Sequence, residues 1–72
     1  MRLRNRLKEI RLDKELTQES LAEAVDVTRQ TIIAIEKGRF GPSAELALKL
    51  ALVLGVSVET MFWLEDNKGG NP

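Results

Sequence analysis

Apolar positions along the chain recur at helical spacing, and turn residues separate them into short segments. No alternating apolar pattern is long enough to indicate a strand. The predicted fold class is therefore all-α, a five-helix bundle without a sheet. The five helices are expected over residues 3–13, 18–24, 29–37, 43–54 and 58–64.

Capping residues fix where these helices begin and end. Thr17, Thr28 and Ser57 can each accept a hydrogen bond from a free amide of the first turn, and Pro42 with Ser43 opens the fourth helix. Gly38 closes the third helix. The linker at 25–27 is too short for anything but a tight turn, so the second and third helices are predicted to form a helix-turn-helix over residues 17–38.

Each helix carries an apolar stripe that is expected to face one common core. The fourth helix is apolar almost all round, with only Glu45 and Lys49 polar, so we expect its neighbours to cover most of its faces. The other predicted stripes are Leu3, Leu7 and Ile10 in the first helix, Leu21, Ala22 and Val25 in the second, Ile32 and Ile35 in the third, and Val58, Met61 and Phe62 in the fifth.

The chain has 72 residues, which is the size of one domain, expected over 1–66 with a flexible tail at 67–72. It contains neither histidine nor cysteine. The commonest general base, the commonest thiol nucleophile and the usual transition-metal ligands are thus missing, and we expect no catalytic activity, no metal and no cofactor. No apolar run spans a membrane, no signal peptide is evident, and the predicted location is cytoplasmic.

The formal net charge is zero, but the charges are sorted along the chain. Residues 1–14 carry six basic and two acidic side chains, whereas residues 15–26 carry four acidic side chains and no basic one. Residues 27–42 are again basic, with three cations and one anion. The folded chain could therefore present one basic face to DNA despite its neutral sum.

The outward arc of the third helix combines side chains that can read DNA. A helical wheel places Arg29, Gln30, Ile33, Ala34 and Lys37 within one arc, opposite the core residues. Arginine can bond the edge of guanine, glutamine that of adenine, and alanine or isoleucine can contact the methyl group of thymine. The alternative is that the polar members are ordinary solvated residues, but an outward isoleucine is hard to explain on a solvated face.

Glu36 falls on the inward arc of the same helix, where a buried carboxylate needs a partner. Arg11, at the edge of the first helix's core stripe, is the natural candidate. We therefore predict a structural ion pair between Arg11 and Glu36. The alternative is that both side chains reach solvent.

Four segments together resemble the xenobiotic-response-element family of helix-turn-helix regulators, whose domain is shared by phage lambda-type repressors and Cro. The resemblance covers about residues 5–65, and the joint spacing of the segments makes it specific. It implies a lambda-repressor-like domain that binds double-stranded DNA, and it implies the same Arg11–Glu36 pair. The segments are Leu16-Thr17-Gln18-Glu19-Ser20-Leu21-Ala22, Val27-Thr28-Arg29-Gln30-Thr31-Ile32, Ile35-Glu36-Lys37-Gly38 and Leu54-Gly55-Val56-Ser57.

By this resemblance, Gln18 would bond a backbone phosphate or an outer base, and Thr28 a phosphate. Arg29, Gln30, Ile33 and Ala34 would meet base edges, while Lys37 and Arg39 in the following loop would hold the backbone of the other strand. The sequence departs from the family at Asp26, where the turn usually has glycine. Aspartate tolerates the left-handed conformation better than most residues, so the turn is expected to survive.

Trp63 and Leu64 have no obvious place in the core on the predicted fifth helix. An exposed tryptophan beside a leucine indicates a contact between two copies, and a two-fold dimer would match paired operator half-sites. The alternative is that Trp63 folds back over its own core.

These observations predict a sequence-specific repressor that binds a pseudo-palindromic operator as a homodimer, with no membrane or small-molecule partner evident. An antitoxin-like module that mainly holds a protein partner is a second hypothesis, weakened by the lack of a long disordered arm. A purely structural helical module is a third.

Overall fold

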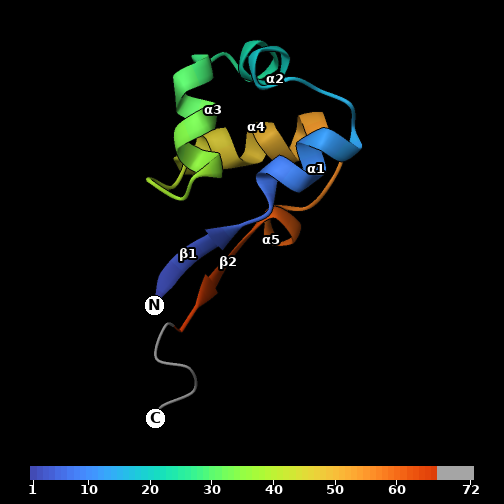
Figure 1. Ribbon diagram of the computed structural model, residues 1–72. Coiled ribbons are helices and arrows are strands. Elements are labelled where there is room, and N and C mark those ends of the chain that lie inside the picture. Colours follow the sequence, from blue (N-terminus) through green and yellow to red (C-terminus); the bar gives the residue numbers. More distant parts are fainter. Residues whose placement is uncertain (67–72) are drawn as a thin grey trace.

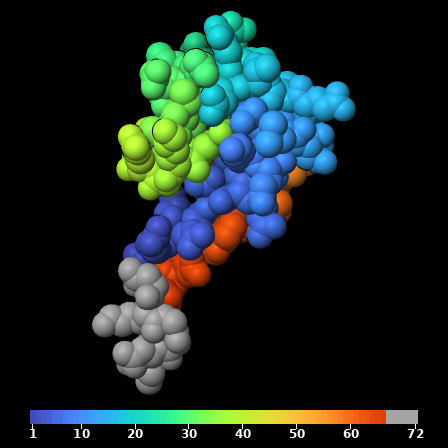
Figure 2. All heavy atoms as spheres, viewed as in Figure 1, coloured from blue at the N-terminus to red at the C-terminus, as the bar shows by residue number. Residues whose placement is uncertain are grey.

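The computed structural model describes residues 1–66, in which helices form the body and two short strands form a ribbon that projects from it (Figures 1 and 2). The two strands come from opposite ends of the described chain and lie side by side. The elements are β1 (Arg2–Asn5), α1 (Leu7–Asp13), α2 (Gln18–Ala24), α3 (Arg29–Glu36), α4 (Ala44–Leu54), α5 (Val58–Met61) and β2 (Phe62–Glu65).

The β1–β2 sheet corrects the all-α prediction. The strands are antiparallel, with Arg2 opposite Glu65, Leu3 opposite Leu64, Arg4 opposite Trp63 and Asn5 opposite Phe62. The first helix therefore begins at Leu7 rather than Leu3, and the last helix ends at Met61 rather than Leu64. Each strand has only four residues, and its partner lies at the other end of the chain, so local periodicity could not reveal the pairing.

Asn5 fixes the junction between β1 and α1. Its side-chain oxygen accepts a hydrogen bond from the Leu7 amide at 3.0 Å, and its side-chain nitrogen donates to the Ile35 carbonyl at 2.9 Å. The Arg6 amide donates to the Met61 carbonyl at 3.0 Å. These bonds stop α1 from extending backward and tie its start to the end of α3 and the end of α5.

The predicted N-caps are confirmed, and Ser43 caps α4 in the same way. Each hydroxyl accepts a hydrogen bond from the amide three residues later, which satisfies one of the free donors at the start of the helix. In α2 the Ser20 hydroxyl also accepts from the Thr17 amide, so the two residues cap each other. The cap bonds run from Ser20 to Thr17, from Thr31 to Thr28, from Leu46 to Ser43 and from Thr60 to Ser57.

Helices α1, α2 and α3 all end in a Schellman motif, in which a residue with left-handed backbone geometry bonds back to the last turn. That residue is Glu15 after α1, Asp26 after α2 and Gly38 after α3, with φ values of 60°, 63° and 76°. The left-handed turn expected at Asp26 is confirmed, and Glu15 is a second, unexpected example. The closing amide–carbonyl pairs are Leu16–Arg11, Val27–Ala22 and Arg39–Ala34.

The core lies where the inner faces of the helices meet, and most predicted stripes contribute to it. Leu3 is the exception, because it belongs to β1 and is 40% exposed. The fourth helix is also less covered than expected, since Leu48 and Leu52 are 64% and 84% exposed. The buried apolar residues are Leu7, Leu21, Ala22, Val25, Ile32, Ile35, Leu46, Leu50, Leu54, Met61 and Phe62.

The predicted tail at 67–72 lies outside the described residues. Within residues 1–66, no helix is long and apolar enough to cross a membrane.

Glu15 and Asp26, which adopt the left-handed conformation at two helix ends, lead to a prediction about stability. Replacing Glu15 or Asp26 with glycine should raise the free energy of unfolding by about 1 kcal/mol each, because the left-handed conformation strains residues with a side chain and glycine adopts it freely. Removing an anion from the negative end of a helix acts in the same direction. Urea unfolding at one fixed protein concentration measures the change.

Glu23→Gly is the matched control, because Glu23 is exposed within α2 and helical. It should lower the free energy of unfolding by about 1 kcal/mol. Destabilisation by all three glycine substitutions would contradict the assignment of strain to the helix ends.

Candidate nucleic-acid interface

The outer face of α3 is exposed because the inner face is held in the core. Ile32 and Ile35 are completely buried, while Arg29, Gln30 and Lys37 are exposed on the other side or at the end of the helix. The arc predicted from the helical wheel thus exists as a surface. Ile33 and Ala34, expected to point outward in the same arc, are half-buried, so only part of each is available.

The turn between α2 and α3 sets the direction in which this face points. Asp26 turns the chain after α2, and Thr28 caps the next helix, so only residues 25–27 lie between the end of α2 and that cap. Figure 1 shows α2 beside the N-terminal end of α3, with the two helix axes at an angle to each other. This is the arrangement of a helix-turn-helix, in which the second helix is the recognition helix.

A buried ion pair between Arg11 and Glu36 joins α1 to the end of α3. The Arg11 Nε donates to Glu36 Oε2 at 2.7 Å, and Nη2 donates to Glu36 Oε1 at 3.3 Å. The side chains are only 7% and 4% exposed. The remaining guanidinium nitrogen, Nη1, donates to the Leu16 carbonyl at 2.8 Å, so one side chain connects α1, the loop after it and α3.

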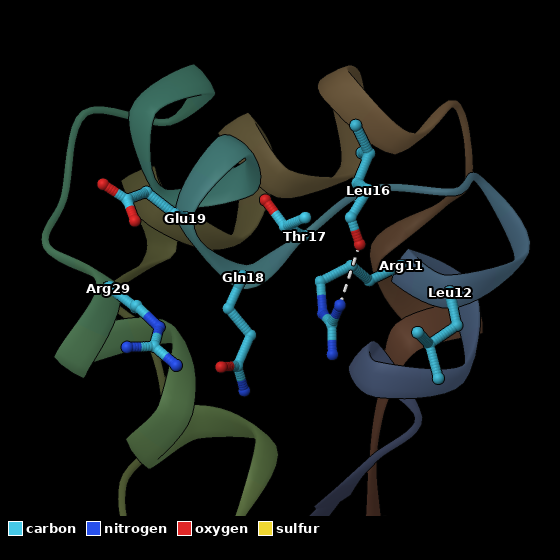
Figure 3. Close-up of a pocket in the computed structure, with 7 residues that line it drawn as sticks. All are labelled: Arg11, Leu12, Leu16, Thr17, Gln18, Glu19 and Arg29. Atoms are coloured by element: carbon cyan, nitrogen blue, oxygen red, sulfur yellow. Dashed lines mark hydrogen bonds between the residues drawn. The ribbon is translucent and has the colours of Figure 1, made fainter.

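Gln18 extends this network to the edge of the recognition face. Its side-chain nitrogen donates to Glu36 Oε1 at 3.1 Å. Because an ionised carboxylate can only accept hydrogen bonds, the amide of Gln18 must turn its nitrogen, not its oxygen, toward Glu36. The second hydrogen of the Gln18 amide is left to donate to an outside acceptor such as a phosphate, and the side-chain oxygen can accept from another donor. In Figure 3, Gln18 lies between Arg11 and Arg29, and its oxygen points toward the Arg29 guanidinium.

These side chains line an open depression of about 460 Å³ at the N-terminal end of α3 (Figure 3). Arg11 contributes little free charge there, because its guanidinium is paired with Glu36. Arg29 forms no ion pair within residues 1–66, but Glu19 brings a carboxylate to the same depression. The depression therefore has a mixed local charge. Directed hydrogen bonds from Gln18 and Arg29 are more important there than a net positive charge.

The other residues expected at DNA lie around the same surface. Thr28 is exposed at the N-cap of α3, where its hydroxyl accepts from the Thr31 amide at 3.3 Å. Lys37 and Arg39 are exposed in the turn that follows α3. The structure thus brings the eight predicted residues together on the first turn of α2, on α3 and in the following turn.

Trp63 and Leu64 lie on β2 instead of a helix. The Arg6 guanidinium stacks over the Trp63 ring at 4.8 Å from its centroid, so the half-buried ring is covered from this side by a cation. Leu64 is 64% exposed and lies opposite Leu3 in the ribbon. An exposed apolar surface is present at this point, although its element differs from the prediction.

Sequence reasoning missed the positions that connect the ribbon to the interface. The helical pattern assigns no role to Asn5 and Arg6, yet Asn5 bonds to the Ile35 carbonyl in the last turn of α3. Asparagine side chains often bond the backbone two residues on in an Asx turn, so Asn5 could have indicated a turn just before the true helix start at Leu7. Stacking of Arg6 on Trp63 depends on strand pairing and leaves no local signal.

Comparison with known proteins agrees with this geometry. A sequence profile of the helix-turn-helix family matches residues 7–61. An HTH-type transcriptional regulator of Methanocaldococcus jannaschii is 50% identical over 66 residues, covering 92% of this chain and 100% of that protein. The transcriptional repressor RstR of a cryptic phage in Vibrio cholerae is 33% identical over 54 residues, covering 75% of this chain and 49% of the repressor.

Solved structures also share the fold. A crystal structure of a protein from Bacteroides fragilis matches 85% of this chain and 98% of its own, with a TM-score of 0.78 and 26% identity. The restriction-modification controller protein C.AhdI from Aeromonas hydrophila has a TM-score of 0.70 and 33% identity over 75% of this chain and 82% of its own.

The buried ion pair generates the second stability prediction. Glu36→Ala should lower the free energy of unfolding by about 3–5 kcal/mol, because it leaves the Arg11 guanidinium buried without its counter-charge. The double variant Arg11→Met, Glu36→Leu should be more stable than Glu36→Ala, since apolar residues of similar size remove both charges at once. Urea unfolding followed by circular dichroism compares the three proteins.

Glu45→Ala provides the control, because it removes a carboxylate from an exposed ion pair with Lys49. Its effect should stay below about 1 kcal/mol. An unfolding midpoint for Glu36→Ala equal to that of the unsubstituted protein would show that the pair does not hold the helices together.

Proposed function

Because the chain belongs to the Cro/C1-type family of helix-turn-helix transcriptional regulators, we propose that it is a repressor that binds a pseudo-palindromic operator as a homodimer. It is a DNA-binding regulator of transcription. In the proposed complex, α3 of each copy lies in the major groove of one half-site. Arg29 and Gln30 contact base edges, and Ile33 and Ala34 contact thymine methyl groups.

One observation carries the proposal: α3 presents polar side chains able to read bases on a face that the core holds in place. Arg29 and Gln30 are exposed, and the Arg11–Glu36 pair fixes the far end of the same helix. A bidentate contact to a base requires precise geometry, and a fixed backbone position helps the side chain to reach it. The rigid attachment of α3 supports a reading function over simple attraction to the backbone.

The remaining predicted residues would position the domain on the phosphates. Gln18 and Thr28 at the N-terminal side of α3, with Lys37 and Arg39 at its C-terminal side, are placed to contact the two backbones that border the groove. Such contacts orient the protein and make its affinity depend on salt, without reading the sequence. Choice of operator then depends on Arg29, Gln30 and the pairing of two copies.

The β1–β2 ribbon supports a contact between copies at Leu64, whereas Trp63 lies on the opposite face of β2 and is covered by Arg6. Leu64 and Leu3 are partners across the ribbon and form an exposed apolar surface on one of its faces. A two-stranded ribbon is marginally stable alone, and its open edges favour pairing with another strand. Association of two ribbons would cover these leucines and relate two α3 helices by a two-fold axis.

Selection of bound sites from random duplex DNA at a stated salt concentration tests the proposal. The unsubstituted protein should enrich an inverted repeat with half-sites about 34 Å apart, or a multiple of that distance. Gln30→Ala should relax the base preference at one position in each half-site and weaken binding by about 1–3 kcal/mol, because an exposed base-reading side chain is lost.

Lys49→Gln is the control for this selection, because Lys49 lies on α4 and pairs with Glu45. It should enrich the same motif as the unsubstituted protein. Failure to enrich any motif, or an unchanged preference after Gln30→Ala, would contradict base reading by α3.

Analytical ultracentrifugation tests the contact between copies. Leu64→Asp should sediment as a monomer at concentrations of tens of micromolar, where the unsubstituted protein is a dimer, because the charge would be buried between two ribbons. Leu52→Asp is the matched variant on the other exposed apolar surface, at 84% exposure on α4, and should remain a dimer.

The opposite pattern, with Leu52→Asp monomeric and Leu64→Asp dimeric, would place the interface on α4 and overturn the ribbon contact. A monomeric unsubstituted protein would overturn the dimer itself.

A further inference from the structure

A small basin lies at the C-terminal end of α3, on the side away from Gln18. Its volume is about 170 Å³, and the cationic residues Arg2, Arg4 and Lys37 line it together with Gly38. Two of these cations belong to β1, a segment far from the helix-turn-helix in the sequence. Figure 2 shows the dark blue surface of β1 directly below the yellow-green surface at the end of α3.

The basin carries a net positive charge. Glu36 also borders it, but its side chain is 4% exposed and its carboxylate is already bonded to Arg11 and Gln18. Arg4 is paired with Glu65 at 2.6 Å on the ribbon surface. Arg2 and Lys37 form no ion pair within residues 1–66, so their charges are available to an external anion.

Three contacts hold β1 in place beside α3. The strand is paired with β2 over four residues, and Asn5 bonds to the Ile35 carbonyl at 2.9 Å. Leu3 packs so closely on Gly41 that a Cβ atom there would lie 2.7 Å from the Leu3 side chain. The backbone that carries Arg2 is thus fixed relative to the recognition helix, which a free N-terminal arm would not be.

The position of the basin relative to α3 indicates which ligand it suits. The eight residues of α3 span roughly 12 Å, which is about the width of the major groove of B-DNA. Gln18 and Arg29 lie at one end of the helix, and the basin lies at the other end, beyond Lys37. When α3 occupies the groove, groups at its two ends approach the two phosphate backbones that border it.

From this placement we infer that Arg2 of β1, together with Lys37, binds one backbone phosphate of the DNA duplex, on the strand opposite the one contacted near Gln18. This inference rests on the proposed function, because it requires α3 in the major groove. It extends the DNA interface from the helix-turn-helix to the strand at the other side of the domain. The ribbon then has two roles, since its leucine face is proposed for the dimer and its basic strand for DNA.

The salt dependence of DNA affinity tests the inference on a mixed-sequence duplex and on the selected operator. Arg2→Ala should reduce the slope of log K against log salt by about 0.9 on both duplexes, which is the value of one phosphate contact. The ratio of operator to mixed-sequence affinity should stay constant, because phosphate contacts do not read bases. Arg2→Lys should keep most of the slope, and Lys49→Gln should keep all of it.

Neutral methylphosphonate groups, substituted one at a time into the operator, locate the contact. One substitution should weaken the unsubstituted protein but leave Arg2→Ala unaffected, and it should lie on the strand opposite the phosphate that shows the same coupling with Gln18→Ala. Binding of the unsubstituted protein with an unchanged slope for Arg2→Ala, or purely additive effects at every phosphate, would overturn the basin as a phosphate site. Absence of binding to any duplex would instead overturn the proposed function.

Discussion

The buried pair of Arg11 and Glu36 is the interaction on which the rest of this small domain depends. Two charges with side chains 7% and 4% exposed are tolerated only because each finds partners with good geometry. The guanidinium bonds to Glu36 and to the Leu16 carbonyl, and the carboxylate also accepts from Gln18. A chain of 72 residues has a total stability of roughly 4–11 kcal/mol, so losing one partner would remove a large part of it.

This pair also explains how a fold with little core can hold a recognition helix rigidly. The inner face of α3 contributes only Ile32 and Ile35 to the fully buried residues. Polar contacts at the C-terminal end of α3 complete its attachment, through Glu36 and the Asn5–Ile35 bond. The side chains on the outer face of α3 are therefore not needed to hold the helix in place. The proposed reading surface is thus separate from the contacts that hold α3, and the proposed phosphate contacts lie at the two ends of this helix.

Local signals in the sequence predicted the helical part of the fold, because helix periodicity and capping act within a few residues. The caps at Thr17, Thr28 and Ser57 and the left-handed turn at Asp26 were predicted in this way. The partnership of Arg11 with Glu36 followed from placing one carboxylate on an inward arc. The ribbon could not be predicted, because Leu3 and Leu64 pair across the whole domain and Leu3 fits a helical stripe equally well. The basin at Arg2 and Lys37 could not be predicted either, because it forms only when β1 lies beside the end of α3.

We propose that a buried polar network fixes α3 so that its outer face reads the major groove. A crystal structure of the protein bound to its selected duplex tests this most directly. We expect two copies with α3 in major grooves about one helical turn apart, with Arg29 and Gln30 on base edges and the Arg11–Glu36 pair intact. A complex with α3 turned away from the groove, or with the ion pair opened and α3 displaced, would contradict it.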